Sequence, residues 1–98
     1  MKDLISGLNK VFESRIRLGV MSVLMVNDSF DFNGLKDTLN VTDGNLASHL
    51  RALEEKKMIR VNKQFIGRKP NTSYSITEEG AHLFQLHLKA LEDLINNQ

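Results

Sequence analysis

The segment between Leu39 and Leu53 constrains the fold most. It has the pattern of a short turn followed by an amphipathic helix. Thr42 is a candidate N-cap, because its hydroxyl can accept from the free backbone N–H groups of a first helical turn. The residues Leu46, Leu50 and Leu53 then recur at i, i+4 and i+7, which places three leucines on one narrow stripe. The spacing predicts a helix over about 42–57 that buries this stripe.

The opposite side of the expected helix is small and polar near its start. On a wheel of about 100° per residue this side carries Gly44, Asn45, Ser48, Arg51, Ala52 and Glu55. No bulky apolar group there prevents close approach to another surface, so the N-terminal half of the helix could lie in a DNA major groove. Taken alone, the segment fits an ordinary amphipathic surface helix equally well.

The preceding segments predict a chain that is mainly helical. Apolar spacing indicates a short helix over residues 2–12, a longer one over 13–27, a very short extended segment around Phe30 and Phe32, and a helix over 33–39. Only a few residues around Asn40 separate the last of these from the helix at 42–57. Two helices joined so closely must cross at a steep angle, and residues 33–57 are therefore expected to form a helix-turn-helix.

Residues 58–77 show the alternation of a β-hairpin rather than helical spacing. Apolar and polar side chains alternate on both arms, and the inward positions are expected to be Ile59, Val61, Thr72, Tyr74 and Ile76, with Phe65 as a further candidate. The run from Gly67 to Asn71 has the composition of a turn. The whole chain, 1–98, then reads as one α+β domain with this hairpin following the helix-turn-helix.

The segment 77–98 predicts a final helix with more apolar surface than one subunit can cover. Thr77 is its candidate N-cap, with acidic residues in the first turn where the helix dipole favours them. Because large exposed apolar patches are rare on monomers, we expect this helix and the N-terminal helix, 1–12, to form a homodimer. The expected interface residues are Leu4, Leu8, Phe12, Leu88, Leu91 and Ile95. Packing of the helix wholly within its own subunit is the alternative.

The net charge of +1 conceals an uneven distribution. Residues 56–77 carry six basic side chains and no acidic one, whereas 1–55 sum to −2 and 78–98 to −3. Cations confined to one segment favour a localised anionic partner, here double-stranded DNA, over a merely solvated hairpin. The absence of cysteine and of any long apolar run fits a cytoplasmic chain without a membrane segment.

Two blocks of the sequence, in this order, resemble a known group of regulators. Leu39 to Ile59 is similar to the "LxxTxGNLSxHLxxLExxGxI" recognition segment of bacterial and archaeal winged helix-turn-helix regulators, and Phe65 to Thr77 is similar to their "F.GRRPRTTYxLTxEG" wing. The group is similar to the MarR and ArsR regulators, and the resemblance covers residues 12–85. It implies a dimeric transcriptional regulator with a β-hairpin wing and extra N- and C-terminal dimerisation helices. One departure is Lys56-Lys57-Met58, where the group has a small residue or glycine, and it should alter the helix exit without undoing the fold.

The candidate DNA-binding residues come from the predicted helix and wing. They are Thr42, Gly44, Asn45, Ser48, His49, Arg51, Lys63, Arg68, Lys69 and Asn71. Among them His49 is as well placed for packing as for contact with a phosphate or base. His82 and His87 would point about 140° apart on a helix with 3.6 residues per turn, a poor geometry for one metal. Neither a metal, nor a cofactor, nor an enzymatic constellation is expected.

Two functions of different class remain open at this stage. The first is a homodimeric DNA-binding regulator, with the helix 42–57 in the major groove and the wing on the backbone or in the minor groove. The second is a winged helix that binds a protein partner and no DNA. Uncompensated cations at Lys63, Arg68 and Lys69 favour the first, because a protein-binding wing does not need them. The operator, the sign of regulation and any small-molecule effector cannot be read from the residues.

Overall fold

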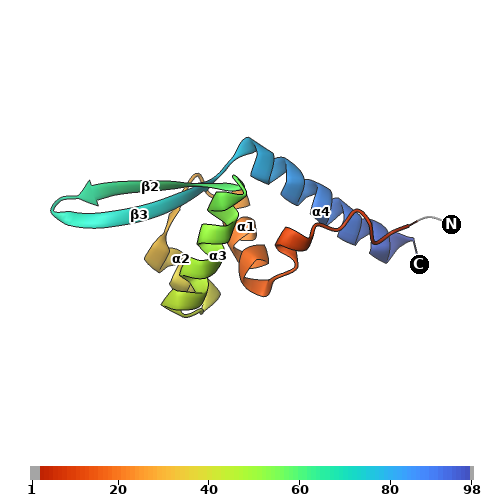
Figure 1. Ribbon diagram of the computed structural model, residues 1–98, viewed down its shortest axis with the longest axis horizontal. Coiled ribbons are helices and arrows are strands. Elements are labelled where there is room, and N and C mark those ends of the chain that lie inside the picture. The colour runs from red at the N-terminus through yellow and green to blue at the C-terminus, as the bar shows by residue number, and fades with distance from the viewer. Residues whose placement is uncertain (1–2, 98) are drawn as a thin grey trace.

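The computed structural model describes residues 3–97; residues 1, 2 and 98, which the expected terminal helices included, lie outside this part. In chain order the elements are α1 (Arg15–Met25), β1 (Phe30–Asp31), α2 (Phe32–Leu39), α3 (Asp43–Glu55), β2 (Ile59–Ile66), β3 (Lys69–Ile76) and α4 (Glu78–Asn96). The molecule measures 59 × 25 × 21 Å, with the β2–β3 hairpin at one end, α4 at the other and α1–α3 grouped between them (Figure 1). This order agrees with the winged helix arrangement expected from the sequence.

The helices begin where a short polar side chain can cap them. The hydroxyl of Thr42 accepts from the backbone N–H of Asn45 at 3.3 Å, and that of Thr77 accepts from Gly80 at 2.9 Å. Ser14 and Asp31 cap α1 and α2 in the same way. Each cap satisfies a backbone donor that the first helical turn leaves free. The expected caps at Thr42 and Thr77 are therefore confirmed.

The leucine stripe of α3 forms the centre of the core. Leu46 and Leu53 are fully buried and Leu50 is nearly so, because α1 packs against this side of α3. Burial of such a side chain contributes roughly 1.5–3 kcal/mol. The other fully or almost fully buried side chains are Phe12, Val20, Met21, Leu24, Leu35 and Phe84. Within residues 3–97, no helix combines the length and apolarity that crossing a membrane requires.

The backbone turns at the C-terminal end of α3 although no glycine is present there. Lys57 adopts a left-handed backbone with φ 60°, its N–H donates to the carbonyl of Glu54 at 2.9 Å, and the N–H of Met58 donates to Leu53 at 3.0 Å. These two bonds form a Schellman motif, in which glycine usually occupies the left-handed position. The lysine therefore stands where the resemblance places a glycine.

The sheet is antiparallel and has strand order β1-β3-β2. Ile66 pairs with Lys69, so the hairpin closes through a two-residue turn at Gly67 and Arg68, with Gly67 at φ 66°. The expected longer turn, 67–71, is wrong, because Lys69, Pro70 and Asn71 belong to β3. Proline is accepted there because β1 pairs only with Ser73 and Tyr74, so the other edge of β3 is open at Pro70.

The base of the hairpin is fixed to the start of α4. The Thr77 hydroxyl donates to the carbonyl of Lys57 at 2.7 Å, and the Thr77 N–H donates to that of Met58 at 3.1 Å. Gly80 follows one turn later, and a Cβ at this position would collide with the backbone carbonyl of Met58. Contact between the two backbones thus sets the direction in which the hairpin leaves the core.

The expected helix at residues 2–12 is wrong over its described part. Only Lys10–Phe12 forms a helical turn, of the 3-10 type. The Asp3 carboxylate instead accepts from the N–H groups of Ile5 and Ser6, and the Asn9 N–H donates to Nδ1 of His87 on α4 at 3.0 Å. Turns capped by side chains and docked on α4 have replaced the helix that apolar spacing indicated.

Candidate nucleic-acid interface

The side of α3 opposite the leucines is exposed, as its composition predicts. Thr42, Gly44, Asn45, Ser48 and Arg51 all face solvent. The Thr42 hydroxyl is already bound to the first turn of the helix, whereas Asn45, Ser48 and Arg51 point outward without a described side-chain partner. Short and flexible polar groups on the first turns of a helix are suited to contacts with base edges and phosphates.

Gly44 gives this side an unusually low profile. A Cβ built at Gly44 would meet no atom within 4 Å, and its backbone does not need the left-handed conformation. The fold therefore does not require glycine here, although glycine weakens a helix relative to alanine. Close approach of an external surface to the α3 backbone is a physical reason for its presence.

Arg17 on α1 and His49 on α3 form a contact that the sequence did not reveal. The Nε of Arg17 donates to Nδ1 of His49 at 2.9 Å, and both side chains are half-buried. Because Nδ1 accepts this hydrogen bond, Nε2 is the ring nitrogen that carries a proton and can act as a donor. His49 therefore serves packing between helices, and the guanidinium of Arg17 adds a cation beside α3.

The one acidic residue in the first turn of α3 is neutralised locally. Nζ of Lys36 on α2 lies 2.7 Å from the Asp43 carboxylate. The hydrogen bond and the negative charge of Asp43 raise the pKa of Lys36. The pair is exposed, so it contributes little to stability, but it reduces the repulsion that Asp43 would exert on an approaching anion.

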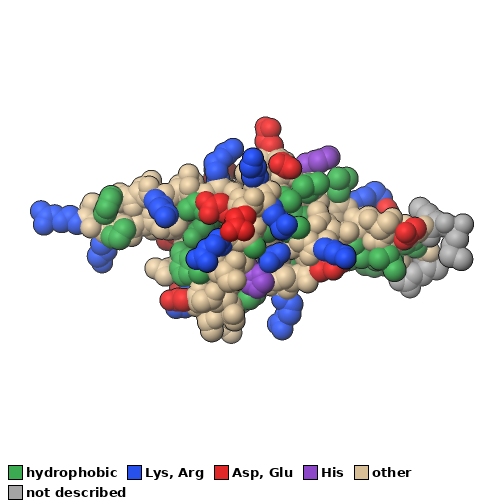
Figure 2. Space-filling model, in the orientation of Figure 1, with side chains coloured by type: hydrophobic (Ala, Val, Ile, Leu, Met, Phe, Trp, Pro, Cys, Tyr) green, Lys and Arg blue, Asp and Glu red, His purple; other side chains and the backbone are tan. Residues whose placement is uncertain are grey.

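The hairpin carries its cations outward beside α3. Lys63, Arg68 and Lys69 are exposed, and neither β2 nor β3 contains an acidic residue. Figure 2 shows basic side chains at and near the far end of the hairpin. A hollow of about 250 Å³, to which Arg51 and Lys63 both contribute, lies between α3 and the hairpin. One candidate residue from α3 and one from the hairpin thus border a common hollow, which Glu54 also lines.

Asn71 differs from the other candidate wing residues. It is half-buried, and its side-chain amide donates to the Asp31 carboxylate at 3.4 Å. Asp31 in turn accepts from the Gly34 N–H at 2.7 Å and caps α2. Asn71 therefore ties the hairpin to the helix-turn-helix, which gives it a structural role.

A second hollow, of about 630 Å³, opens where α3 begins. The exposed Arg15 from the start of α1 and Asn45 from α3 line it, together with Asn40 and Val41 from the turn. Arg15 and Arg17 were absent from the sequence-based candidates, because no motif marks them and they approach α3 only through the packing of α1. They extend the basic border of the site.

Of three residues that were considered for a dimer interface or a metal site, two are buried and one is exposed. Phe12, expected at a dimer interface, is buried in its own subunit, with its ring 5.2 Å from that of Phe84, so that prediction is wrong. His87 is buried beside both rings, whereas His82 is exposed. Nowhere in residues 3–97 do three histidine, cysteine, aspartate or glutamate side chains gather as they would around a metal ion.

Comparison with known proteins identifies the architecture. The family model described as a winged helix DNA-binding domain matches residues 16–95. The chain belongs to this family. An uncharacterized protein of Methanocaldococcus jannaschii, MJ0432, is similar to this winged helix protein, with 34% identity over 88 residues that span 90% of this chain and 96% of the relative.

Solved structures agree with this assignment. A transcriptional regulator homologue from Pyrococcus horikoshii superposes with a TM-score of 0.79 and 30% identity, over 95% of this chain and 97% of that one. Staphylococcus aureus MepR, solved in complex with DNA, shares the fold with a TM-score of 0.75 at 17% identity, over 94% of this chain and 75% of its own. An ArsR family regulator also shares the fold, with a TM-score of 0.63 at 19% identity, over 97% of this chain and 93% of that one. The expected winged helix-turn-helix fold, similar to MarR and ArsR regulators, is confirmed.

Proposed function

We propose that this winged helix protein is a sequence-specific, double-stranded-DNA-binding transcriptional regulator that acts as a cytoplasmic homodimer and catalyses no reaction. The observation that carries the proposal is the exposed polar side of α3 beside a hairpin that bears only positive charge. A helix of this kind enters the major groove, and cations on the hairpin neutralise phosphates on either side. The fold shared with MepR, a protein solved in complex with DNA, supports this role.

Each candidate residue except Asn71 then has a part in binding. Asn45 and Ser48 contact base edges or nearby phosphates, Arg51 contacts a phosphate, and Thr42 caps the helix within reach of the backbone. Lys63, Arg68 and Lys69 contact phosphates through the hairpin. Gly44 allows close approach, and Nε2 of His49 donates to a phosphate or base acceptor.

The first test is selection of duplexes from a random library with the parent protein and Asn45→Ala. The parent should enrich one motif with two related half-sites. Loss of a good base contact costs roughly 1–3 kcal/mol of discrimination, so the variant should prefer a different or less defined site. If both proteins select the same motif with the same affinity, Asn45 does not contact a base. If the parent enriches no duplex, sequence-specific binding is contradicted.

The second test separates phosphate binding from a protein-binding wing. Arg68→Ala combined with Lys69→Ala should weaken binding to all duplexes and lower the slope of log K against log salt by about two units, roughly 0.9 for each lost phosphate contact. Folding should be unchanged, because both side chains are exposed at the turn. Titration of labelled duplex at several salt concentrations measures both effects. An unchanged affinity and slope would favour the alternative, a winged helix that binds a protein and no DNA.

A further inference from the structure

The far end of the hairpin exposes apolar side chains that the fold does not use. Phe65 is 73% exposed, although it continues the inward positions of β2 that begin at Ile59 and Val61, and Ile66 on the opposite face is 61% exposed. The sheet gives them no cover, because β1 pairs with β3 only at Ser73 and Tyr74, nearer the core. Exposing a phenyl ring on a projecting two-stranded ribbon contributes nothing to the core, so its use lies outside the subunit.

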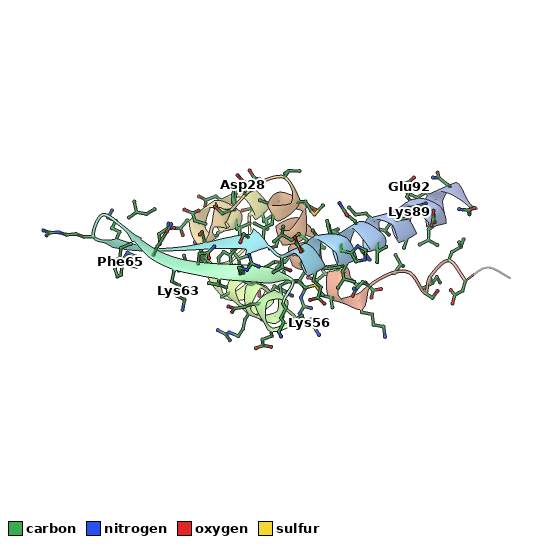
Figure 3. The ribbon with its side chains drawn as sticks, turned by 90° about the horizontal axis from the view of Figure 1, so that it is seen from above. Asp28, Lys56, Lys63, Phe65, Lys89 and Glu92 are labelled. Atoms are coloured by element: carbon green, nitrogen blue, oxygen red, sulfur yellow. The ribbon has the colours of Figure 1, made fainter. Side chains whose placement is uncertain are left out.

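Phe65 lies on the side of the hairpin that faces α3. It is opposite Pro70 in the register, and Lys63 is opposite Thr72 on the same side of the ribbon. The side chains of Lys63 and Phe65 project from the ribbon toward the side on which α3 lies, whereas Asp28 is on the other side (Figure 3). A surface that contacts α3 and the hairpin together would therefore also meet Phe65.

The surroundings of Phe65 select an anionic occupant. Lys63, Arg68 and Lys69 flank it, and no acidic residue occurs anywhere in β2 or β3. Side chains two positions apart on one strand are separated by about 7 Å. Lys63 can therefore contact a phosphate while Phe65 enters the groove between the two phosphate backbones. An apolar ring on a hairpin whose charged side chains are all cations fits a minor groove, where sugars and base edges offer apolar surface between two rows of phosphates.

We propose that Phe65, backed by Pro70, is an apolar wedge that enters the DNA minor groove beside the major groove occupied by α3. This inference rests on the proposed function and names the contact made by the wing. The wedge adds affinity by apolar burial, which releases no counterions, so its contribution is independent of salt. It also favours sites whose minor groove opens readily at that point, such as pyrimidine–purine steps, without a hydrogen bond to any base.

A tryptophan introduced in place of Phe65 reports on the wedge directly, because the chain contains no tryptophan of its own. Phe65→Trp is mixed with the duplex selected by the parent, and quenching of its fluorescence by the neutral molecule acrylamide is measured with and without DNA. The quenching constant should fall roughly three-fold or more on binding, because a ring inserted in the groove is shielded from the quencher. Val26→Trp is the matched control. Val26 is 82% exposed and lies two residues from Asp28, which is on the side of the hairpin away from α3 (Figure 3). Quenching of an indole at this position should therefore be the same with and without DNA.

Phe65→Ala gives a second, independent readout. Its affinity should fall on the order of ten-fold, as expected for loss of a buried phenyl ring, with the salt slope of the parent retained. Arg68→Ala combined with Lys69→Ala should instead lower the slope.

Three outcomes would overturn the wedge. The first is a parent that binds DNA while the indole of Phe65→Trp stays as accessible as in the free protein, and the second is a Phe65→Ala variant that binds like the parent. The third is protection of that indole at high protein concentration without DNA, which would assign the ring to contact between copies. If the parent binds no duplex, the wedge and the proposed function both fail.

Discussion

At the residue scale, Gly44 shows how a side chain can be absent for a reason other than folding. A Cβ at this position meets nothing within 4 Å, so Gly44→Ala should fold normally and raise the free energy of unfolding by roughly 0.5 kcal/mol. The added methyl group would nevertheless stand between the α3 backbone and the DNA. We expect weaker binding from a more stable protein, measured by urea unfolding and by titration of the selected duplex.

The control for Gly44→Ala is Ser22→Ala, on the exposed side of α1. Ser22 donates its hydroxyl to the carbonyl of Leu18 in its own helix at 2.7 Å, and alanine is the better helix former there as well. It should leave DNA binding unchanged. Binding by Gly44→Ala as tight as that of the control would mean that the α3 backbone is not closely approached.

Single residues also show which contacts can be read from sequence. Thr42, the α3 leucines and the alternation of Ile59 and Val61 were predictable, because neighbours within four residues determine caps, stripes and alternation. Arg17 and His49 are 32 residues apart, and no local pattern connects them. Phe12 was assigned to a dimer interface for the same reason, since its apolar character gave no sign that Phe84 would cover it.

At the element scale, the end of α3 offers a test of backbone strain. Lys57 adopts φ 60°, and the left-handed conformation costs a residue with a Cβ roughly 1 kcal/mol more than glycine. Lys57→Gly should therefore raise the free energy of unfolding by about 0.5–1 kcal/mol, measured by chemical denaturation. Lys56→Gly is the matched control. Its position has φ −86°, so the same loss of charge should give no gain. Equal effects of the two variants would show that φ at Lys57 is not a source of strain.

Elements with strong local signals were predicted within one to three residues, whereas the N-terminal segment was not. Apolar spacing at residues 4, 8 and 12 indicated a helix, but Gly7 and Asn9 favour turns and the neighbouring α4 offered better contacts. A Cβ at Gly7 would lie 3.1 Å from that of Ala90, so this segment approaches α4 closely. Contacts between segments that are distant in sequence determined its conformation, and periodicity could not reveal them.

At the scale of the whole molecule, the hairpin and the exposed apolar side chains of α4 lie at opposite ends. The hairpin projects from one end and α4 from the other (Figure 1). Leu88 and Ile95 are seven residues apart on α4, so they lie on one side of the helix, and they are 42% and 71% exposed; Leu86, 50% exposed, lies on the other side. We propose that a second copy covers part of this surface, since a two-fold arrangement would leave both α3 helices and both hairpins free to meet half-sites about one DNA turn apart.

Ile95→Glu tests this arrangement better than a change at Leu91, because Leu91 is half-buried and lines a hollow of its own subunit with Leu8 and Phe12. Ile95 contributes little to the monomer, so a carboxylate there should leave folding intact while placing a charge in the apolar contact between copies. Analytical ultracentrifugation at tens of micromolar should give a dimer for the parent and a monomer for the variant. His82→Glu, exposed on a different side of the same helix, also adds a carboxylate and should remain dimeric. A monomeric parent would contradict the dimer, and DNA binding by single copies would then have to depend on one half-site.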